Sequence, residues 1–304
     1  MDTYVAGWDG GGTKTRVVCL SAGGEPFAEH TFGPLNPNGT SETEVCRTVS
    51  EALRWMETLG RCTALTVSSA GVSNPDVSSL LGRLLSENGY HERFQLVGDQ
   101  ESALYGAVGP YGAVLVAGTG SICYGRNRQG DTARSGGYGY LVDDEGSGYA
   151  IGRDILTAVL RAGDGRIHPT KLTELLSADQ SWADVPSILH NLYHIGFEKA
   201  KIAALAPLVL EAGSDQAACQ ILQKAAKELT LLATTVIDRL GLQNERIAFT
   251  GSILLRMPPV RTAVADALTQ RYPALRGFEP QADAAHGAAR MSLQMIGKDC
   301  ELHA

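Results

Sequence analysis

The stretch that decides the fold is residues 4–20, YVAGWDGGGTKTRVVCL: an apolar run, a glycine-dense bend and a second, β-branched run. It predicts a β-hairpin whose bend binds phosphate. The three glycines at 10–12 allow positive φ and a close approach of backbone N–H groups to anionic oxygens. Thr13 and Thr15 add hydroxyl donors. Taken alone, the same pattern is explained equally well by an ordinary tight hairpin.

Asp9 ends the first apolar run, beside the expected phosphate. A carboxylate is favourable there only if a divalent cation stands between it and the phosphate, so Asp9 is a first indication of Mg²⁺. The nearest alternative is a Walker A loop, which places a lysine directly after its second glycine and continues as a helix. Here Thr13 occupies the lysine position, and residues 16–20, RVVCL, favour a strand. The stretch is therefore not a Walker A loop.

Length and composition predict a soluble globular protein of two lobes. The chain has 304 residues, more than one domain usually holds, with 44% hydrophobic and 19% charged residues. No uninterrupted apolar run is long enough to span a bilayer, so no membrane partner is expected. With 26 basic and 33 acidic residues the formal charge is −7, which gives no general attraction for nucleic acid.

Two further features indicate a cytoplasmic protein. The chain passes from Met1 and Asp2 almost directly into the first expected strand, with no basic region and no apolar signal core. Its six cysteines are widely scattered and form no Cys-x-x-Cys pair, which favours reduced structural thiols over disulfides, zinc or an iron–sulfur cluster.

The first third of the chain alternates strands with helices, the pattern of an α/β fold with a parallel sheet. After the hairpin, a third antiparallel strand is expected over 26–32. A capping box of Ser41 and Glu44 opens a helix that ends at Gly60. The remaining elements are a strand at 65–71, a helix from 74–75 to 89, and a strand at 94–97.

Asp99 follows a strand directly. The carboxyl end of a strand is where α/β proteins place their chemistry, which makes Asp99 a candidate catalytic residue. The same position suits an N-cap, and geometry permits both roles. Glu101, in the first turn of the following helix, is explained more simply by the helix dipole. In the loop 33–39, GPLNPNG, Asn36 and Asn38 have no helix to cap, so they are ligand candidates, although loop stabilisation explains them as well.

A second strand–bend–strand unit repeats the opening pattern at residues 112–126, GAVLVAGTGSICYGR. Its bend, residues 118–121, again combines glycines with hydroxyls. Each hairpin is weak support by itself. As a pair they suggest two related lobes that each offer a phosphate-binding hairpin to one nucleotide.

Residues 135–148, SGGYGYLVDDEGSG, form the most unusual segment of the chain. Five glycines and three consecutive carboxylates make a poor core strand or helix, so a shaped loop is expected. A solvated acidic turn is the alternative interpretation. A ligand role is favoured, because the loop directly precedes a helical pattern at 149–160 and is flanked by aromatic residues that suit a sugar ring.

Helical patterns dominate residues 149–240. Within them His190 and His194 are four residues apart and could share a metal, but the glutamate of a zincin motif is missing. We therefore expect ordinary core or surface histidines.

The last quarter of the chain adds one strand and one helix. A strand at 246–250 leads to a turn of two small residues, Gly251 and Ser252. A nucleoside could lie against the backbone of this turn. The alternative interpretation is a plain connection between strand and helix. Residues 284–293, AAHGAARMSL, predict a helix of small residues that can pack tightly.

These motifs occur in an order that resembles the BadF/BadG/BcrA/BcrD ATPase family, specifically its N-acetylglucosamine kinase-like members. The two glycine hairpins alone are shared by the whole actin–hexokinase–chaperone superfamily. The run GGYG at 136–139, followed by DEGSG at 144–148, is specific to the amino-sugar kinase branch. The resemblance covers nearly the whole chain.

The resemblance implies an α/β fold of two ribonuclease-H-like, actin-like ATPase lobes, with an active-site cleft between them and a helical insertion in the second. The N-terminal lobe would span 1–111 and carry the first hairpin and the catalytic aspartate, joined by a C-terminal helix over 286–304. The C-terminal lobe would span 112–285 and carry the second hairpin, the sugar loop, the helical segment and the adenosine motif. A homodimer is typical of such proteins.

The resemblance also implies the ligands and their residues. The substrates would be ATP with Mg²⁺ and a small-molecule sugar, and Asp9 would hold the metal through water. Binding of ATP would fall to Gly11, Gly12, Thr13, Thr119, Gly120, Gly251 and Ser252. Binding of the sugar would fall to Asn36, Asp99, Gly137 and Asp144.

The implied reaction is transfer of the γ-phosphate of ATP to the 6-hydroxyl of N-acetylglucosamine or glucosamine. Phosphoryl transfer requires alignment and charge neutralisation, with a carboxylate, here Asp99, accepting the hydroxyl proton. Two residues depart from the family pattern: Tyr138 replaces a frequent Trp, and Asp143 replaces a Gly before Asp144. An extra carboxylate at the sugar would favour a cationic amine, hence glucosamine, and would disfavour the anionic N-acetylmuramic acid.

Three alternatives stay open. One is an N-acetylmuramic acid kinase. Another is an ATPase activator of a dehydratase or reductase, which needs paired cysteines near the nucleotide; Cys62 and Cys123 fall on separate expected strands and make poor cluster ligands. The third, a filament-forming or chaperone-like nucleotide switch, does not explain the loop around Asp144.

Overall fold

The computed structural model of the protein describes residues 3–36, 40–194 and 198–297. Contacts within the chain group it into two compact units, one of residues 1–111 with 280–304 and one of residues 112–279. Residues 280–285, expected in the second lobe, group with the first unit. The N–H groups of Gln281 and Ala282 donate to the carbonyls of Ala107 (3.0 Å) and Gly106 (2.9 Å), which lie in that unit.

The first unit is built on a five-stranded sheet in the order β3-β2-β1-β4-β5. Its strands are β1 (Thr3–Gly10), β2 (Thr15–Ser21), β3 (Pro26–Phe32), β4 (Arg61–Ser69) and β5 (Arg93–Val97). β1 pairs antiparallel with β2 and parallel with β4, and β4 pairs parallel with β5. The carboxyl ends of β1, β4 and β5 therefore meet at one edge of the sheet.

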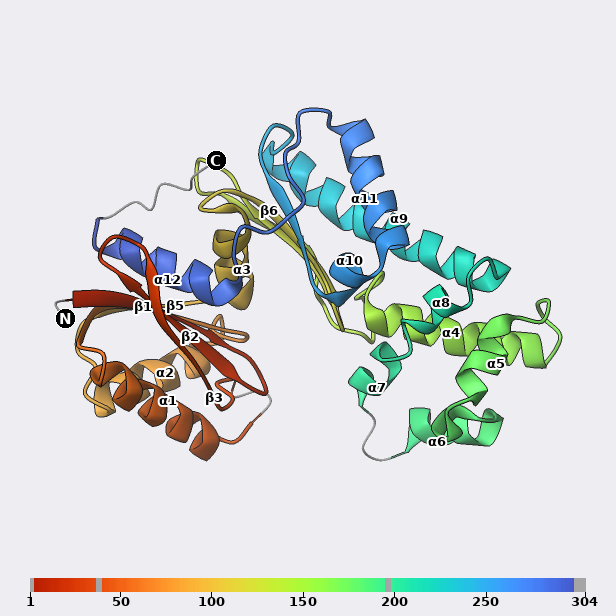
Figure 1. Cartoon of the computed structure of the whole chain (residues 1–304), viewed down its shortest axis with the longest axis horizontal. Coiled ribbons are helices and arrows are strands. Elements are labelled where there is room, and N and C mark those ends of the chain that lie inside the picture. Colours follow the sequence, from red (N-terminus) through yellow and green to blue (C-terminus); the bar gives the residue numbers. More distant parts are fainter. Residues whose placement is uncertain (1–2, 37–39, 195–197, 298–304) are drawn as a thin grey trace. The chain divides into compact units, whose positions relative to one another are not determined.

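Helices cover both faces of this sheet (Figure 1). One face packs against α1 (Glu42–Glu57) and α2 (Pro75–Glu87), and the other against α12 (Ala284–Met295), beside which lies α3 (Asp99–Val108). The predicted capping box of α1 is present: the Ser41 hydroxyl accepts from the Glu44 N–H (3.3 Å), and a Glu44 carboxylate oxygen accepts from the Ser41 N–H (3.4 Å).

Helix α12 lies unusually close to the sheet and to α3. A Cβ on Gly7 would stand 2.0 Å from the Ala289 nitrogen, and one on Gly287 would stand 2.0 Å from the Ser102 carbonyl oxygen. The helix runs Ala284–Met295 rather than over the expected 286–304, whose last residues, 298–304, lie outside the described part. Small residues on both partners allow this approach.

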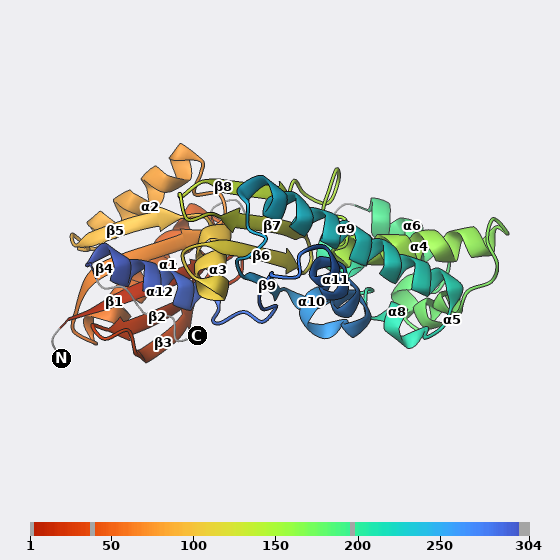
Figure 2. The same cartoon turned by 90° about the horizontal axis from the view of Figure 1, so that it is seen from above.

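The second unit holds a four-stranded sheet in the order β8-β7-β6-β9. Its strands are β6 (Gly112–Ala117), β7 (Ser121–Arg126), β8 (Thr132–Gly136) and β9 (Ile247–Thr250), with β6 and β9 parallel. Strand β8 was not expected, and it takes the first two residues of the segment assigned to a shaped loop. The long helix α9 (Gln216–Leu240) packs on this sheet (Figure 2), where a Cβ on Gly125 would stand 2.6 Å from a Val236 methyl.

The rest of the second unit is helical, as expected. Between β8 and α9 lie α4 (Gly148–Gly163), α5 (Lys171–Ser177), a 3₁₀ turn (Gln180–Trp182), α6 (Val185–Tyr193), α7 (Lys199–Ala203) and α8 (Leu208–Glu211); α10 (Ser252–Arg256) and α11 (Pro258–Arg271) follow β9. The ring centroids of His190 and His194 lie 4.5 Å apart with the rings tilted by 36°, and no metal-binding cluster of His, Cys, Asp or Glu occurs among the described residues. No helix in that part of the chain is long and apolar enough to cross a membrane.

Candidate active site

The first glycine hairpin closes on itself. The Gly11 N–H donates to the Lys14 carbonyl (2.9 Å), and the Gly11 carbonyl accepts from the N–H groups of Leu35 (3.1 Å) and Asn36 (3.2 Å). The bend thereby fixes the backbone of Asn36, a predicted sugar ligand, beside it. Asn38, the other candidate, lies outside the described residues.

The glycines of this bend are needed for close packing around the backbone rather than for unusual dihedral angles. None of residues 10–12 has a positive φ, so that expectation is wrong. A Cβ on Gly10 would stand 2.6 Å from a Leu35 methyl, whereas nothing stands within 4 Å of a Cβ on Gly12. Thr13 is exposed at the tip, but the Thr15 hydroxyl, expected as a ligand donor, is buried and donates to the Gly33 carbonyl (2.8 Å). Gly12 and Thr13 thus leave the tip of the bend open.

Asp9 is the penultimate residue of β1, opposite Arg16 in β2 and Ser68 in β4. Burial, followed by the negative charges of Asp99 and Asp283, raises the pKa of Asp9 to about 6, although Arg16 and Lys14 act in the opposite direction. The interaction with Asp99 indicates that the two predicted carboxylates lie at the same edge of the sheet. This edge carries the carboxyl ends of β1 and β5.

Asp99 is the first residue of α3 and not its N-cap. The cap position is occupied by Gly98 (φ −66°, ψ 151°), so the N-cap interpretation of Asp99 is wrong. A carboxylate oxygen of Asp99 accepts from the Gln100 N–H (3.0 Å), and the exposed side chain stands at the end of β5. Glu101 instead holds the helix start, accepting from the Gly98 N–H (3.4 Å).

A third acidic residue at this edge, Asp283, was missed from the sequence. It caps α12 by accepting from the His286 N–H (3.0 Å) and ring Nδ1 (2.9 Å), and it forms an ion pair with Arg16 of β2. The hydrogen bonds from His286 and the charge of Arg16 hold the pKa of Asp283 well below its usual range. An Asp before a small-residue helix could have signalled the cap, but nothing in the sequence signals the contact with β2.

The second glycine hairpin is joined to the acidic loop. The carboxylate of Asp144 is buried and accepts from the Ser121 N–H (3.4 Å), and a Cβ on Gly120 would stand 2.8 Å from its other oxygen. Burial raises the pKa of Asp144, and the Ser121 N–H opposes that rise. Asp144 has a positive φ of 62°, the sole non-glycine case in the described chain. The predicted sugar residue Asp144 therefore lies against the predicted ATP residue Gly120.

Three further hydrogen bonds fix this junction. The Ser121 hydroxyl donates to the Glu145 carbonyl (2.7 Å), the Gly148 N–H to the Gly118 carbonyl (2.7 Å), and the Tyr149 N–H to the Thr119 carbonyl (3.3 Å). We call residues 118–121 and 144–149, with these bonds, the hairpin–loop clamp. The start of α4 is thereby tied to the bend.

The side chain of Glu145 anchors the clamp to two helices. It forms ion pairs with Arg153 of α4 (2.6 Å) and Lys224 of α9 (3.3 Å), and both bases also contact Asp154. The pKa of Glu145 lies below its usual range because Arg153 and Lys224 outweigh burial. The sequence did not predict Arg153 or Lys224, since the latter lies far along the chain on another helix.

The loop between Gly137 and Asp144 is shaped by contacts within the second unit. Gly137 has φ 76°, a conformation that favours glycine, and a Cβ there would also stand 2.8 Å from an Ile122 methyl. A carboxylate oxygen of Asp143 accepts from the Tyr138 N–H (3.0 Å) across the turn. Asp143 therefore has a structural role in the loop that the sequence interpretation did not foresee.

Gly251 lies beside the end of β6. It has φ 87°, and a Cβ would stand 2.4 Å from the Ala117 carbonyl oxygen, so the chain itself requires glycine here. Ser252 begins α10, whose Leu255 N–H donates to the Gly251 carbonyl (3.0 Å). The expected adenosine turn is thus adjacent to the strand that leads into the second hairpin.

The two units each bring part of the predicted site together. The first gathers Asp9, Asp99 and the bend with Gly11, Gly12, Thr13 and Asn36 at the ends of parallel strands; the second gathers Thr119, Gly120, Asp144, Gly251 and Ser252 around the end of β6. Two α/β units with a glycine hairpin in each are the arrangement of an actin-like ATPase. The expected α/β class with two lobes and a helical segment in the second is thereby confirmed.

Comparison with known proteins places the chain more closely. The profile of the BadF/BadG/BcrA/BcrD ATPase family matches residues 6–292, and the chain belongs to this family. An N-acetylmuramic acid/N-acetylglucosamine kinase of Clostridium acetobutylicum is 32% identical over 94% of this chain and 96% of its own length. An N-acetyl-D-glucosamine kinase of Dictyostelium discoideum is 31% identical over 94% and 97%.

A solved structure supports the fold independently of these sequences. A Chromobacterium violaceum protein, provisionally assigned as an N-acetylglucosamine kinase, superposes with a TM-score of 0.73 at 27% identity, over 96% of this chain and 99% of that one. The resemblance seen in the glycine and acidic motifs is therefore confirmed over residues 6–292.

Proposed function

We propose that this protein is an ATP-dependent amino-sugar kinase that transfers the γ-phosphate of ATP to the 6-hydroxyl of N-acetylglucosamine or glucosamine. The observation that carries the proposal is the placement of Asp9 and Asp99 at the carboxyl ends of β1 and β5, at one edge of the first sheet and next to an open glycine bend. One carboxylate would serve the nucleotide and its metal, and the other the acceptor hydroxyl. The two relatives named as kinases of N-acetylated amino sugars support an amino-sugar acceptor.

Asp99 is the proposed general base. It would accept the proton of the 6-hydroxyl as that oxygen attacks the γ-phosphorus, while Asn36, Gly137 and Asp144 orient the sugar. Backbone N–H groups of both glycine bends, with Thr13 and Thr119, would hold the phosphates, and the turn at Gly251 and Ser252 would hold the adenosine. Asp144 also supports the second bend directly.

Asp9 fits the role of a Mg²⁺ ligand through water. Mg²⁺ keeps several of its waters and uses one or two carboxylates together with substrate phosphates. Asp9 faces two other negative charges that raise its pKa, so a cation beside it would lower the cost of keeping it ionised. When bound, the metal would supply neutralisation of the phosphate charge.

The preferred amino sugar depends on whether Asp143 faces the substrate. Its carboxylate accepts from the Tyr138 N–H, which gives it a role in the loop that needs no substrate. The Clostridium relative, named for both N-acetylmuramic acid and N-acetylglucosamine, favours N-acetylmuramic acid as a second substrate. Asp143→Gly is expected to leave the ranking of the three sugars unchanged.

The deciding experiment is a coupled ADP-release assay with N-acetylglucosamine, glucosamine, N-acetylmuramic acid, glucose and water as acceptors. An amino sugar should give the highest kcat/KM, and mass spectrometry should show one phosphate on O6. ADP release that is independent of every sugar would instead favour the ATPase activator. Against that reading, Cys62 and Cys123 are buried in strands of different sheets, and burial raises their pKa values.

A further inference from the structure

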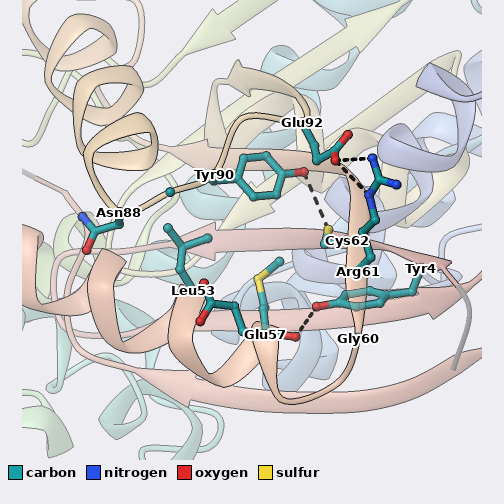
Figure 3. A pocket seen from close by; sticks show the side chains of 11 residues that line it. Tyr4, Leu53, Glu57, Gly60, Arg61, Cys62, Asn88, Tyr90 and Glu92 are labelled. Carbon is teal, nitrogen blue, oxygen red and sulfur yellow. Dashed lines mark hydrogen bonds and ion pairs between the residues drawn. The ribbon is translucent and has the colours of Figure 1, made fainter.

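The first unit contains a cavity of about 340 Å³ at the amino ends of β1 and β4 (Figure 3). Its walls come from the last turn of α1, the first residues of β1 and β4, and the connection between α2 and β5. We propose that this cavity binds a small organic cation with an apolar body, such as an arylalkyl ammonium ion. This inference goes beyond the proposed function and does not depend on it.

The charge of the cavity favours a cation. Three of its lining residues are charged: Glu57, Arg61 and Glu92. The Arg61 guanidinium donates twice to one Glu92 oxygen, through Nε (2.9 Å) and Nη2 (2.6 Å), so this pair is neutral. The exposed Glu57 carboxylate has no hydrogen bond or ion pair within the described chain and leaves one net negative charge.

The buried polar groups of the cavity do not change this balance. Burial raises the pKa of Cys62 to about 11 and raises the pKa values of Tyr4 and Tyr90, so all three are neutral near pH 7. The unpaired charge at Glu57 therefore determines the preference for ligand charge.

Hydrogen bonding points to a ligand that donates. The Tyr4 hydroxyl donates to the Met56 carbonyl (2.6 Å), the Tyr90 hydroxyl to the Arg93 carbonyl (3.2 Å), and the Cys62 thiol to the Ala64 carbonyl (3.2 Å). These protons are used by the protein itself, and the Tyr90 hydroxyl also contacts the Cys62 sulfur (3.7 Å). The Tyr4 oxygen and the Glu57 carboxylate are left as acceptors in the cavity. An ammonium group offers three donors and no acceptor, and so matches them.

The remaining walls are apolar. Leu53, Met56, Tyr4 and Tyr90 are all buried. A volume of 340 Å³ is near the lower end of the range for small-molecule sites, about 300–1,000 Å³. A single aromatic ring with a short alkyl ammonium chain fits within that volume, and tyrosine faces attract such cations.

The cavity is distinct from the proposed active site. Tyr4 is near the start of β1, whereas Asp9 is near its end, five residues and roughly 17 Å further along the strand. A ligand in the cavity would therefore not occupy the place of ATP or the sugar in this unit.

Binding can be followed by NMR of the protein labelled with methyl-¹³C methionine, because Met56 lines the cavity and Met257 and Met291 lie elsewhere as internal references. The probes form a matched series of equal size: 2-phenylethylammonium, neutral 2-phenylethanol and anionic phenylacetate. The Met56 resonance is assigned with Met56→Leu. The variant is Glu57→Gln, and its control is Glu51→Gln, an exposed glutamate of the same helix outside the cavity.

The ammonium ion should shift the Met56 resonance saturably, and Glu57→Gln should weaken its binding about three- to five-fold. Glu51→Gln should leave the affinity unchanged, and neither substitution should affect 2-phenylethanol. Kinase activity of Glu57→Gln equal to that of the wild type would show that the variant is folded. The proposal is overturned if the ammonium ion gives no saturable shift, if Glu57→Gln binds it as well as the wild type does, or if phenylacetate binds equally tightly.

Discussion

Asp99 is exposed at the first position of α3, immediately beyond β5, and its carboxylate accepts from the Gln100 N–H. Replacement by Asn keeps the size and the acceptor oxygen but removes the ability to take a proton. We expect Asp99→Asn to lower kcat about 10²–10⁴-fold, the usual contribution of a positioned base. ATP affinity, measured by calorimetry, should stay within about two-fold, since Asp99 is not assigned to the nucleotide.

A control variant and one contrary outcome test the role of Asp99 as the general base. Glu101→Gln, two residues further along the same helix, should weaken the helix start without abolishing turnover. A kcat of Asp99→Asn close to that of the wild type would remove Asp99 as the base.

The raised pKa of Asp9 predicts how the stability of the protein depends on pH. Its folded pKa of about 6 exceeds the value near 3.9 of an unfolded Asp, so the folded state binds the proton more tightly. Stability from this group is therefore present at low pH and is lost as pH rises from about 4 to 6. Asn imitates the protonated form, and Asp9→Asn should be more stable than the wild type above pH 7 by up to about 3 kcal/mol.

The measurement is urea unfolding in EDTA at pH 4 and pH 8. The two proteins should be nearly equally stable at pH 4 and differ at pH 8. Asp266→Asn, an exposed site in α11, serves as the control and should show no pH-dependent difference. A wild type that is the more stable protein at pH 8 would mean that Asp9 is better compensated than the burial and charges around it indicate.

At the scale of elements, the hairpin–loop clamp is one connected structural unit. Its bonds join a bend, a loop and the start of α4, and its anchor is the ion pair of Glu145 with Arg153 and Lys224. Arg153→Ala leaves the half-buried Glu145 less compensated and should cost about 1–2 kcal/mol of stability. Displacement of the bend and of Asp144 should raise KM for both ATP and sugar.

A merely structural role would reduce stability without changing KM of the folded fraction. Arg153→Lys keeps the charge and should restore part of the affinity. Arg166→Ala breaks a comparable but exposed pair with Asp164 and should leave the kinetics unchanged. Wild-type KM values in Arg153→Ala would show that the clamp does not need its anchor.

The sequence predicted those elements whose signals are local. Both hairpins were predicted because glycine and hydroxyl residues are bracketed by apolar β-branched runs. Strand β8 was missed because TARSG has no apolar alternation, and its pairing with β7 comes from the chain's return across the sheet. In the site, Asp99 and Asp144 were named from their motifs. Asp283 and Arg153 were not, because their partners are distant in sequence.

At the scale of the whole molecule, α12 completes a unit whose sheet and other helices all precede residue 112. The contact depends on Gly7, where a Cβ would stand 2.0 Å from the Ala289 nitrogen and 2.5 Å from the Ala288 carbonyl carbon. Both are backbone atoms of a helix and cannot rotate away. Gly7→Ala should therefore destabilise the protein by more than about 3 kcal/mol, with α12 displaced from β1.

Hydrogen exchange should locate the effect. Amides of α12 and β1 should lose protection in Gly7→Ala, and those of β6 and α9 should keep theirs. Gly23→Ala is the matched control, since the nearest atom to its Cβ would be the Ser21 hydroxyl at 3.6 Å. Full protection of α12 in Gly7→Ala would show that the strand can yield to the added methyl.

The route of the chain through α12 has a consequence for synthesis on the ribosome. Val5, Val18 and Ala64 form the sheet face that α12 covers, and they are translated long before it. The second unit, continuous from residue 112 to 279, is complete while that face still lacks its helix. A nascent chain that stops at residue 279 therefore presents an uncovered apolar sheet, the kind of surface that chaperones bind and that aggregates.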